Sequence, residues 1–261
     1  MDYPQICNIM KREFNNEWFA AWFDSPAYHV LYGNRDNDEA LNLIENLDGI
    51  LSSEVKKVLD VGCGAGRHVV AWEKLGYQAS GFDLSSESIR LAKSKTTNAD
   101  FRVLDMRDLM NQTEWTDEFD LISNLFTSFG YFSKEEEHKS VLIGFNHALK
   151  HGGLLILDYL NVPYSLSRLV PSEVVSIDNY TFTIERYLKD GFFQKSISFK
   201  SPKGKDYNFI EQVRAWTAND LKILLLDVGL QTEKIFGNYD LGDFSDDSPR
   251  CIIVARKILD L

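Results

Sequence analysis

The stretch Val58-Leu59-Asp60-Val61-Gly62-Cys63-Gly64-Ala65-Gly66-Arg67 joins an apolar segment to three alternating glycines. Apolar residues resume at Val69, Val70 and Trp72 with helical spacing. Glycine lets the backbone turn sharply and lets a ligand lie against it with no Cβ in the way. A strand, a glycine turn and a helix in this order predict the first unit of a parallel α/β sheet with a ligand at the turn.

Short apolar runs and helical patterns alternate on both sides of this turn. Strands are predicted at 57–61, 78–82, 101–104, 119–123 and 154–158, with helices between them. Ser133 and Glu136 have the spacing of a capping box at the start of the last of these helices. Its apolar stripe is expected to be buried, and Gly152 suits a left-handed end. The pattern indicates a sheet wound with helices on both faces.

The glycine spacing distinguishes between two kinds of nucleotide site. The dinucleotide fingerprint is G-x-G-x-x-G, and its last position is Arg67 here. The spacing G-x-G-x-G after an acidic residue resembles motif I of the class I methyltransferases that use S-adenosylmethionine (SAM). The resemblance implies that the loop holds the methionine part of SAM and that Asp60 helps to bind its ammonium group. The loop residues concerned are Gly62, Cys63, Gly64 and Gly66.

Two further acids end predicted strands. Asp83, followed by Leu84, is placed to accept hydrogen bonds from both ribose hydroxyls. The resemblance implies that Asp105 binds the adenine amino group while Met106 packs on the ring. Each aspartate alone suits a helix cap or a turn. Three acids at three successive strand ends, all at one edge of the sheet, favour a nucleotide site.

The segment after the fourth strand runs Asn124-Leu125-Phe126-Thr127-Ser128-Phe129-Gly130-Tyr131. It resembles motif IV, and the loop after it, in N-methyltransferases that act on nucleotide-linked amino sugars. The N/D-P-P-Y/F signature of amino methyltransferases acting on DNA and protein glutamine is absent. The resemblance places Asn124, Leu125 and Phe126 at the cofactor and makes Tyr131 a candidate catalytic residue.

The N-terminal region offers candidates for the acceptor side. Residues 4–22 have the aromatic stripe of an amphipathic helix, which ends where Ser25-Pro26 begins. The following segment through Arg35 suits either a lid, with Tyr32 and Arg35 at the cofactor, or a solvated loop. Of the five histidines, His29 is the candidate general base. His68 is expected to pack, and the other three, His138, His147 and His151, are expected at the surface.

Composition narrows the function classes. With 28 Lys+Arg against 39 Asp+Glu, the net charge of −11 disfavours a nucleic-acid partner. The three cysteines have no metal or disulfide spacing, and the N-terminus has no signal-peptide pattern, so a reducing cytoplasm is expected. No metal site is expected, and no apolar run is long enough to cross a membrane.

These patterns predict a Rossmann-like class I methyltransferase fold with an antiparallel β insertion after strand five. Turns of the insertion are expected at Asp190-Gly191 and at Ser201-Pro202-Lys203-Gly204, and Thr217 and Asp220 are expected to cap the helix that follows it. The expected parts are an N-terminal helix and cofactor lid (1–40), a SAM-binding core (41–162), the β insertion as a cap or dimer contact (163–216), and strands that complete the sheet (217–261). The resemblance implies seven strands, the last one antiparallel and inserted between the fifth and sixth.

The expected function is methyl transfer from SAM to a small-molecule acceptor, more readily an amine than a hydroxyl compound. The protein is expected to be a monomer or a homodimer. The alternatives are a small-metabolite O-methyltransferase, a catalytically inactive SAM-binding protein and a nicotinamide-dependent oxidoreductase. Arg67 at the third glycine position disfavours the last of these.

Overall fold

A computed structural model describes residues 17–33 and 37–260 of the 261-residue chain. It divides into two compact units. The core unit comprises Asp36–Gly130, Lys134–Leu169 and Ala215–Leu261, and the β unit comprises Met1–Arg35, Tyr131–Ser133 and Val170–Arg214. Residues 4–16 of the predicted first helix and Arg35 lie outside the described residues.

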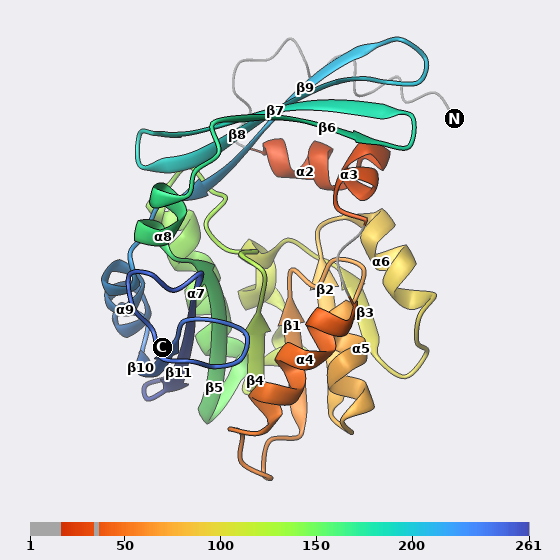
Figure 1. The fold of residues 1–261 in the computed structure, drawn as a ribbon. Coiled ribbons are helices and arrows are strands. Elements are labelled where there is room, and N and C mark those ends of the chain that lie inside the picture. The colour runs from red at the N-terminus through yellow and green to blue at the C-terminus, as the bar shows by residue number, and fades with distance from the viewer. Residues whose placement is uncertain (1–16, 34–36, 261) are drawn as a thin grey trace. The chain divides into compact units, whose positions relative to one another are not determined.

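The core unit is built on a seven-stranded sheet of order β10-β11-β5-β4-β1-β2-β3 (Figure 1). Six strands run in the same direction, and β11 lies antiparallel to them between β5 and β10. This is the order and direction expected from the sequence. The strands are β1 (Lys57–Val61), β2 (Gln78–Asp83), β3 (Asp100–Val103), β4 (Phe119–Asn124), β5 (Leu149–Leu160), β10 (Leu230–Phe236) and β11 (Arg250–Lys257).

Helices bury the sheet through apolar faces. On one side Leu43, Ile44 and Trp72 belong to one buried cluster with Val58 and Ile156 of the strands, and Figure 1 shows α4 on the near side of the sheet. Elsewhere in the core, α7 packs against the short helix η1, where Gly144 makes room for Leu109. The helical elements are α4 (Asn37–Asp48), α5 (Arg67–Lys74), α6 (Ser86–Lys93), η1 (Met106–Asn111), η2 (Thr113–Trp115), α7 (Glu135–Ala148), α8 (Val162–Ser167) and α9 (Ala218–Asp227).

Two predictions about α7 are wrong. The helix begins one residue later than expected, with Lys134 as N-cap. Lysine has no side-chain acceptor, so only Glu137 supplies a capping bond, to the Lys134 amide at 3.3 Å. His138 is not at the surface: it is 1% exposed and packs edge-on against Trp216. It shares a helix face with Val141, Leu142 and Phe145, so the apolar stripe includes it.

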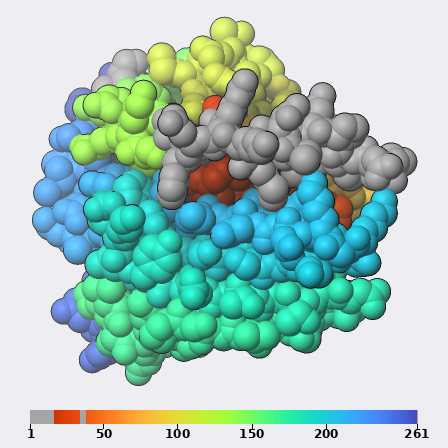
Figure 2. Space-filling view, turned by 90° about the horizontal axis from the view of Figure 1, so that it is seen from above, coloured from red at the N-terminus to blue at the C-terminus, as the bar shows by residue number. Residues whose placement is uncertain are grey.

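The β unit contains an antiparallel sheet of order β6-β7-β8-β9. Its turns fall where the sequence predicted them: Asp190 and Gly191 adopt positive φ between β7 and β8, and Gly204 does so between β8 and β9. In Figure 2 the atoms of the four inserted strands, coloured green to light blue, form one continuous surface. The elements are α2 (Trp18–Phe23), α3 (Pro26–Leu31), β6 (Ser172–Ile177), β7 (Tyr180–Lys189), β8 (Phe192–Lys200) and β9 (Asp206–Arg214).

The β unit has its own apolar core. Trp22 of α2 is fully buried in a cluster with Phe182 and Ile184 of β7 and with Ile197 and Phe199 of β8. The buried strand residues are two apart, so they share one face of the sheet. The N-terminal helices and the inserted strands therefore form one folding unit, although about 130 residues of core sequence separate them.

Candidate functional site

The three glycines of the loop after β1 are needed for two different reasons. A Cβ at Gly62 would lie 2.8 Å from the Ser128 Cβ, and one at Gly66 would lie 2.9 Å from the Ala92 Cβ. A Cβ at Gly64 would meet nothing within 4 Å among the described residues, and φ there is +52°. Protein packing therefore accounts for Gly62 and Gly66, whereas Gly64 faces open space.

Asp60 lies under this loop, at the carboxyl end of β1, and is only 2% exposed. Its Oδ1 accepts a hydrogen bond from the Ser123 hydroxyl at 2.7 Å, and its Oδ2 lies 4.0 Å from Nδ1 of His68. Burial raises the pKa of Asp60 to about 7, against the hydrogen bond from Ser123 and the charge of Arg67. A nearby cation would stabilise its charged form.

Cys63 is buried beside the same group and packs against Gly81 of β2. Burial, with Asp83 and Asp60 nearby, raises the pKa of its thiol well above the ordinary value. The thiol is therefore neutral and unreactive at physiological pH. Cys63 can contribute its backbone and its packing to the loop.

Asp83 at the end of β2 is already bonded to the backbone on both sides. Its Oδ2 accepts from the Gly64 amide and its Oδ1 from the Ser85 amide, each at 2.8 Å. Ser85 is the N-cap of α6, so the carboxylate ties the glycine loop to the start of a helix. Each carboxylate oxygen has a second lone pair, so both oxygens can accept a further donor. Leu84 lies between Asp83 and Ser85 in the sequence.

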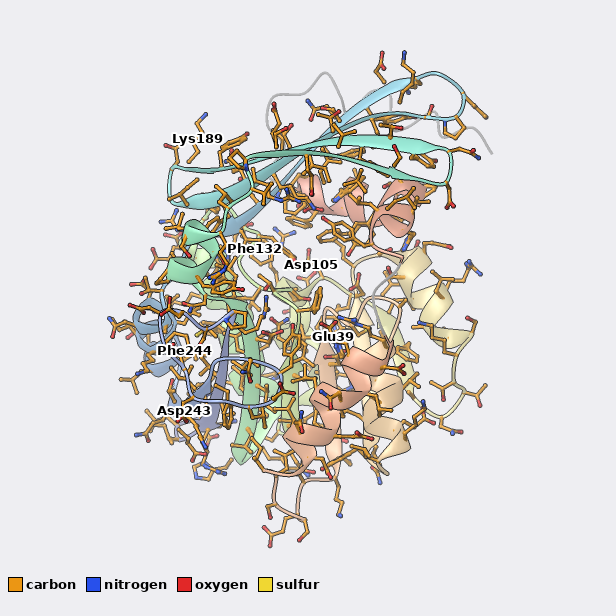
Figure 3. The ribbon with its side chains drawn as sticks, in the orientation of Figure 1. Glu39, Asp105, Phe132, Lys189, Asp243 and Phe244 are labelled. Carbon is orange, nitrogen blue, oxygen red and sulfur yellow. The ribbon has the colours of Figure 1, made fainter. Side chains whose placement is uncertain are left out.

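Asp105, after β3, is held by an arginine that the sequence analysis did not single out. Arg107 donates to Asp105 through its backbone amide at 2.9 Å and its Nη2 at 2.7 Å, and reaches Glu137 of α7 at 2.8 Å. Figure 3 labels Asp105. Met106 begins η1, and Asp105 is its N-cap. Arg107 Nε also donates to both carboxylate oxygens, at 3.1 and 3.2 Å, so Arg107 already uses most of the acceptor capacity of Asp105.

The end of β4 combines an unsatisfied amide with a strained turn. Asn124 is fully buried; its Nδ2 donates to the Val61 carbonyl, but its Oδ1 has no partner among residues 17–33 and 37–260. Leu125 is buried, and Phe126 and Thr127 follow with φ of 61° and 60°. A buried acceptor without a donor is costly in a folded protein. The Asn124 Oδ1 is therefore suited to accept a hydrogen bond from a bound ligand.

A buried ion pair supports this turn. Asp158, which is fully buried at the end of β5, accepts from the Phe126 amide at 2.8 Å and pairs with Arg250 of β11 at 2.7 Å. Arg250 also donates to the Thr127 hydroxyl, and Tyr239 donates to Asp158. Arg67 stacks over the Phe126 ring, 4.4 Å from its centroid. Sequence reasoning missed this network, although Asp158 is one more acid near the end of a parallel strand.

The acceptor-side candidates belong to the β unit. The Tyr131 ring lies 5.5 Å from that of Trp18 and 5.4 Å from that of Phe23. Tyr32 donates to Glu211 of β9 at 2.8 Å, and the same carboxylate accepts from the Trp22 indole and lies 3.6 Å from the Lys195 ammonium.

His29 is on α3 beside Tyr28, with ring centroids 5.5 Å apart. The β unit therefore groups Tyr131 and Tyr32 with further aromatic rings and one carboxylate, and His29 lies against this group through Tyr28.

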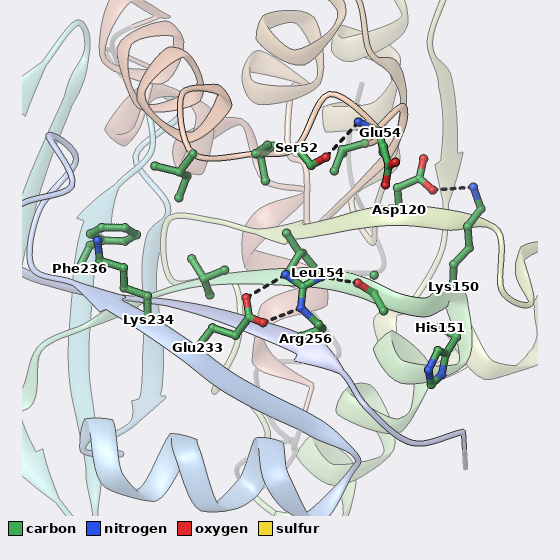
Figure 4. A pocket seen from close by; sticks show the side chains of 16 residues that line it. Ser52, Glu54, Asp120, Lys150, His151, Leu154, Glu233, Lys234, Phe236 and Arg256 are labelled. Carbon is green, nitrogen blue, oxygen red and sulfur yellow. Dashed lines mark hydrogen bonds and ion pairs between the residues drawn. The ribbon is translucent and has the colours of Figure 1, made fainter.

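A cavity of about 560 Å³ lies at the opposite, amino edge of the core sheet (Figure 4). Two of its three acids are paired with bases: Asp120 with Lys150 at 2.6 Å and Glu233 with Arg256 at 2.5 Å. Within the described residues no group of His, Cys, Asp and Glu is arranged to hold a metal ion, and no helix is long and apolar enough to span a membrane.

Comparisons with known proteins identify the core. Residues 58–153 match a family described as a methyltransferase domain. Residues 58–153 therefore form a domain of the methyltransferase family. The predictions of family, enzyme class and SAM as cofactor are thereby confirmed. The match begins with β1 and the glycine loop and includes all three predicted strand-end acids.

Two curated relatives extend the likeness to individual enzymes. Over 251 residues, 94% of this chain and 91% of the relative, the chain is 27% identical to a glycine/sarcosine N-methyltransferase of Aphanothece halophytica. It is also 27% identical to dTDP-3-amino-3,4,6-trideoxy-alpha-D-glucopyranose N,N-dimethyltransferase of Streptomyces venezuelae. That match covers 51% of this chain and spans only about half, 56%, of the relative's length.

A solved structure agrees in fold. The SAM-dependent methyltransferase of Clostridium acetobutylicum superposes with a TM-score of 0.71 at 20% identity, covering 91% of this chain and 97% of that one. At this identity the likeness concerns the fold. It confirms the predicted fold class, including the second, antiparallel sheet.

Proposed function

We propose that this protein transfers the methyl group of SAM to a small-molecule amine. The observation that carries the proposal is Gly64, the one loop glycine whose Cβ direction is open rather than filled by protein. Around it lie carboxylates and a buried amide oxygen without a donor, which are the groups that an ammonium, two ribose hydroxyls and an adenine amino group require. The residues of this chain therefore fit SAM.

The proposed cofactor contacts follow from these groups. Asp60 stabilises the ammonium, Asp83 accepts the ribose hydroxyls, and Asp105 accepts the adenine amino group. Asn124 offers its free Oδ1 to a donor of the ligand. The complete proposed set is Tyr32, Arg35, Asp60, Gly62, Cys63, Gly64, Gly66, Asp83, Leu84, Asp105, Met106, Asn124, Leu125 and Phe126.

When bound, SAM supplies an electrophilic methyl group on a sulfonium. The protein's part is to hold an acceptor in line with that methyl group and to exclude water. A neutral amine carries its own nucleophilic lone pair and needs no strong base. This suits a β unit in which Tyr131 and His29 are the candidates for contact with the acceptor and both lie among aromatic rings.

Two findings support an amine acceptor over a hydroxyl compound. The relatives of Aphanothece and Streptomyces are named for N-methylation of glycine or sarcosine and of an amino sugar nucleotide. The β unit also groups aromatic faces with the Glu211 carboxylate, and such groups bind ammonium and methylated amines through cation–π and ionic contacts. We infer a small acceptor, with no nucleic-acid substrate, and a cytoplasmic protein.

The test offers methyl-labelled SAM with matched acceptors. Each amine, including glycine, sarcosine and amino sugar nucleotides, is paired with its hydroxyl counterpart, and tRNA and DNA are included. Label on an amine alone is the expected result. Label only on hydroxyl compounds or on nucleic acid would overturn the amine proposal, and SAM binding without any transfer would indicate a SAM-binding protein without catalysis.

A pair of variants tests the acceptor role of Tyr131. Tyr131→Ala should lower turnover at least tenfold while the Kd for SAM changes little, because its ring is proposed to contact the acceptor. Tyr131→Phe separates the ring from the hydroxyl: activity close to wild type assigns the role to the ring. An equal loss of turnover and SAM affinity in Tyr131→Ala would contradict the assignment.

A further inference from the structure

Asp60 is an unusual carboxyl group for a position so close to a ligand loop. It is 2% exposed, and the strands on both sides of β1 enclose it: β4 contributes the Ser123 hydroxyl, and β2 ends at Asp83. From α5, His68 approaches its free oxygen at 4.0 Å, and His68 itself is only 6% exposed. The carboxyl group is thus surrounded by neutral and ionisable partners rather than paired with a lysine or arginine in direct contact.

The charges that face Asp60 act in opposite directions. Burial, which is the largest effect, and the Asp83 carboxylate favour the protonated acid, whereas Ser123 and Arg67 favour the carboxylate. The Cys63 thiol, in the adjacent loop, is kept neutral by burial and therefore adds no charge. The resulting pKa of about 7 leaves Asp60 partly protonated at neutral pH.

We propose that the ammonium group of SAM binds with release of the Asp60 proton, and that His68 and Ser123 are positioning residues that set the pH at which this happens. The proposal rests on the cofactor site proposed above. A cation brought close to Asp60 favours its charged form, so the O–H bond of the acid breaks and the proton passes to solvent. Ser123 then donates to the carboxylate, and His68 lies beside its second oxygen.

Linkage fixes the sign of the effect. Because the free protein holds the proton and the complex does not, SAM affinity should rise with pH up to about 7 and level off above it. The slope approaches tenfold per pH unit well below the pKa of Asp60. The α-amino group of SAM stays protonated up to a pH of roughly 7.7, so it does not produce this rise.

Isothermal titration calorimetry tests the proposal without measuring turnover. SAM is titrated at pH 6.5 in two buffers with different ionisation enthalpies, and the difference in heat gives the protons released per ligand. We expect between about half a proton and one proton for SAM. Methylthioadenosine, which keeps the nucleoside but lacks the amino-acid part, is the matched control and should release none.

Variants assign the proton and the positioning roles. Asp60→Asn should bind SAM without proton release. His68→Leu and Ser123→Ala each remove one partner of the carboxylate, so the pH midpoint of SAM affinity should move upward by roughly half a unit or more. His68→Leu should still release the proton, which distinguishes Asp60 from His68 as its source, and Ser123→Thr should restore the wild-type midpoint by keeping the hydroxyl.

The outcomes separate this inference from the proposed function. If SAM produces no binding heat at all, the cofactor site itself is wrong. SAM binding with the same heat in both buffers would overturn only the proton coupling, and so would equal proton release by wild type and Asp60→Asn. Unchanged midpoints in both His68→Leu and Ser123→Ala would overturn their positioning roles.

Discussion

The two edges of the core sheet carry acidic residues in different states. At the amino edge each of three acids has a basic partner: Glu118 lies against Lys57, Asp120 against Lys150 and Glu233 against Arg256. At the carboxyl edge Asp105 and Asp158 are also paired, with Arg107 and Arg250. Asp60 and Asp83 there are bonded instead to a hydroxyl group and to backbone amides. A carboxyl group without an ion pair keeps acceptor capacity for a ligand.

Backbone geometry shows the same difference. At the carboxyl edge Gly64, Phe126 and Thr127 adopt left-handed φ angles, and Asn124 buries an oxygen with no donor among the described residues. Such features lower the stability of the folded protein, and they persist where ligand binding offsets that loss. The amino edge has a sizeable cavity, but two of its three acids, Asp120 and Glu233, are paired with neighbouring bases. A cavity alone is therefore a weaker sign of function than unsatisfied groups around an open glycine.

The largest expected effect compares two glycines. Gly64 and Gly76 both have positive φ and open space in the Cβ direction among the described residues, but Gly76 follows α5 at the amino side of β2. Gly64→Val should weaken SAM binding by more than about a hundredfold, because the side chain fills the ligand's place. Gly76→Val suffers similar backbone strain and should bind SAM normally. Calorimetric titration checks both, and equal losses would remove the distinction between the edges.

The next effect compares two aspartates. Asp83→Ala should cost on the order of 2–4 kcal/mol of SAM affinity, since it loses two charge-assisted bonds to the ligand and the anchor of the Gly64 amide. Asp120→Ala removes an acid that accepts from the Lys150 ammonium and from the Lys56 and Lys57 amides at the amino edge, so the Kd for SAM should stay constant. An unchanged Kd in Asp83→Ala would refute the ribose assignment.

A smaller effect concerns how the free energy of unfolding depends on pH. Asp60 and Asp120 should contribute to this dependence with opposite signs. The folded-state pKa of Asp60 is raised to about 7, so its contribution to stability is full below its unfolded pKa of about 3.9 and is lost as the pH rises through 7. Burial would raise the pKa of Asp120 too, but Lys150 and the amides of Lys57 and Lys56 outweigh it and lower the pKa. Its contribution is present above about 3.9 and is lost as the pH falls.

Thermal unfolding of the ligand-free protein checks this sign. Asp60→Asn should raise Tm at pH 8 by roughly several degrees and by less at pH 5, because it removes a buried charge. Asp120→Asn should lower Tm at pH 8. A lower Tm for Asp60→Asn than for wild type at pH 8 would contradict the expected sign for Asp60.

The smallest effect is expected from Glu233→Gln at the amino edge. Its ion pair with Arg256 is partly exposed, with both side chains about 40% accessible, and such pairs contribute roughly 0–1 kcal/mol. The free energy of unfolding in urea should fall within that range, and SAM affinity should not change. A tenfold loss of affinity would show that the amino edge also takes part in binding.

Much of the fold was predictable because its determinants are local. The predicted bounds of β1 are those observed, and the Thr217–Asp220 capping box opens α9 as expected. The turns of the inserted sheet followed from Asp190-Gly191 and Gly204. In each case two to four adjacent residues decide the backbone conformation, so the signal is present in the sequence.

The rest of the site depends on residues that are distant in sequence. The Asp158–Arg250 pair joins positions 92 residues apart, and Glu137 holds Arg107 from 30 residues away. The burial of His138 depends on its packing against Trp216. Local patterns cannot reveal such partners. The sequence therefore predicted which residues lie at the carboxyl edge, but not which of them already have hydrogen-bond or ionic partners within the protein.

Hydrogen exchange with and without adenosylhomocysteine tests the central claim most directly, because it compares the two edges in one measurement. The carboxyl edge is proposed to hold the ligand, so protection should appear at 61–67, 83–86 and 124–130, including the Gly64 and Ser85 amides that contact Asp83. Segments 52–57 and 150–154 at the amino edge should exchange as before. Protection confined to the amino edge, or absent from the glycine loop, would contradict the account.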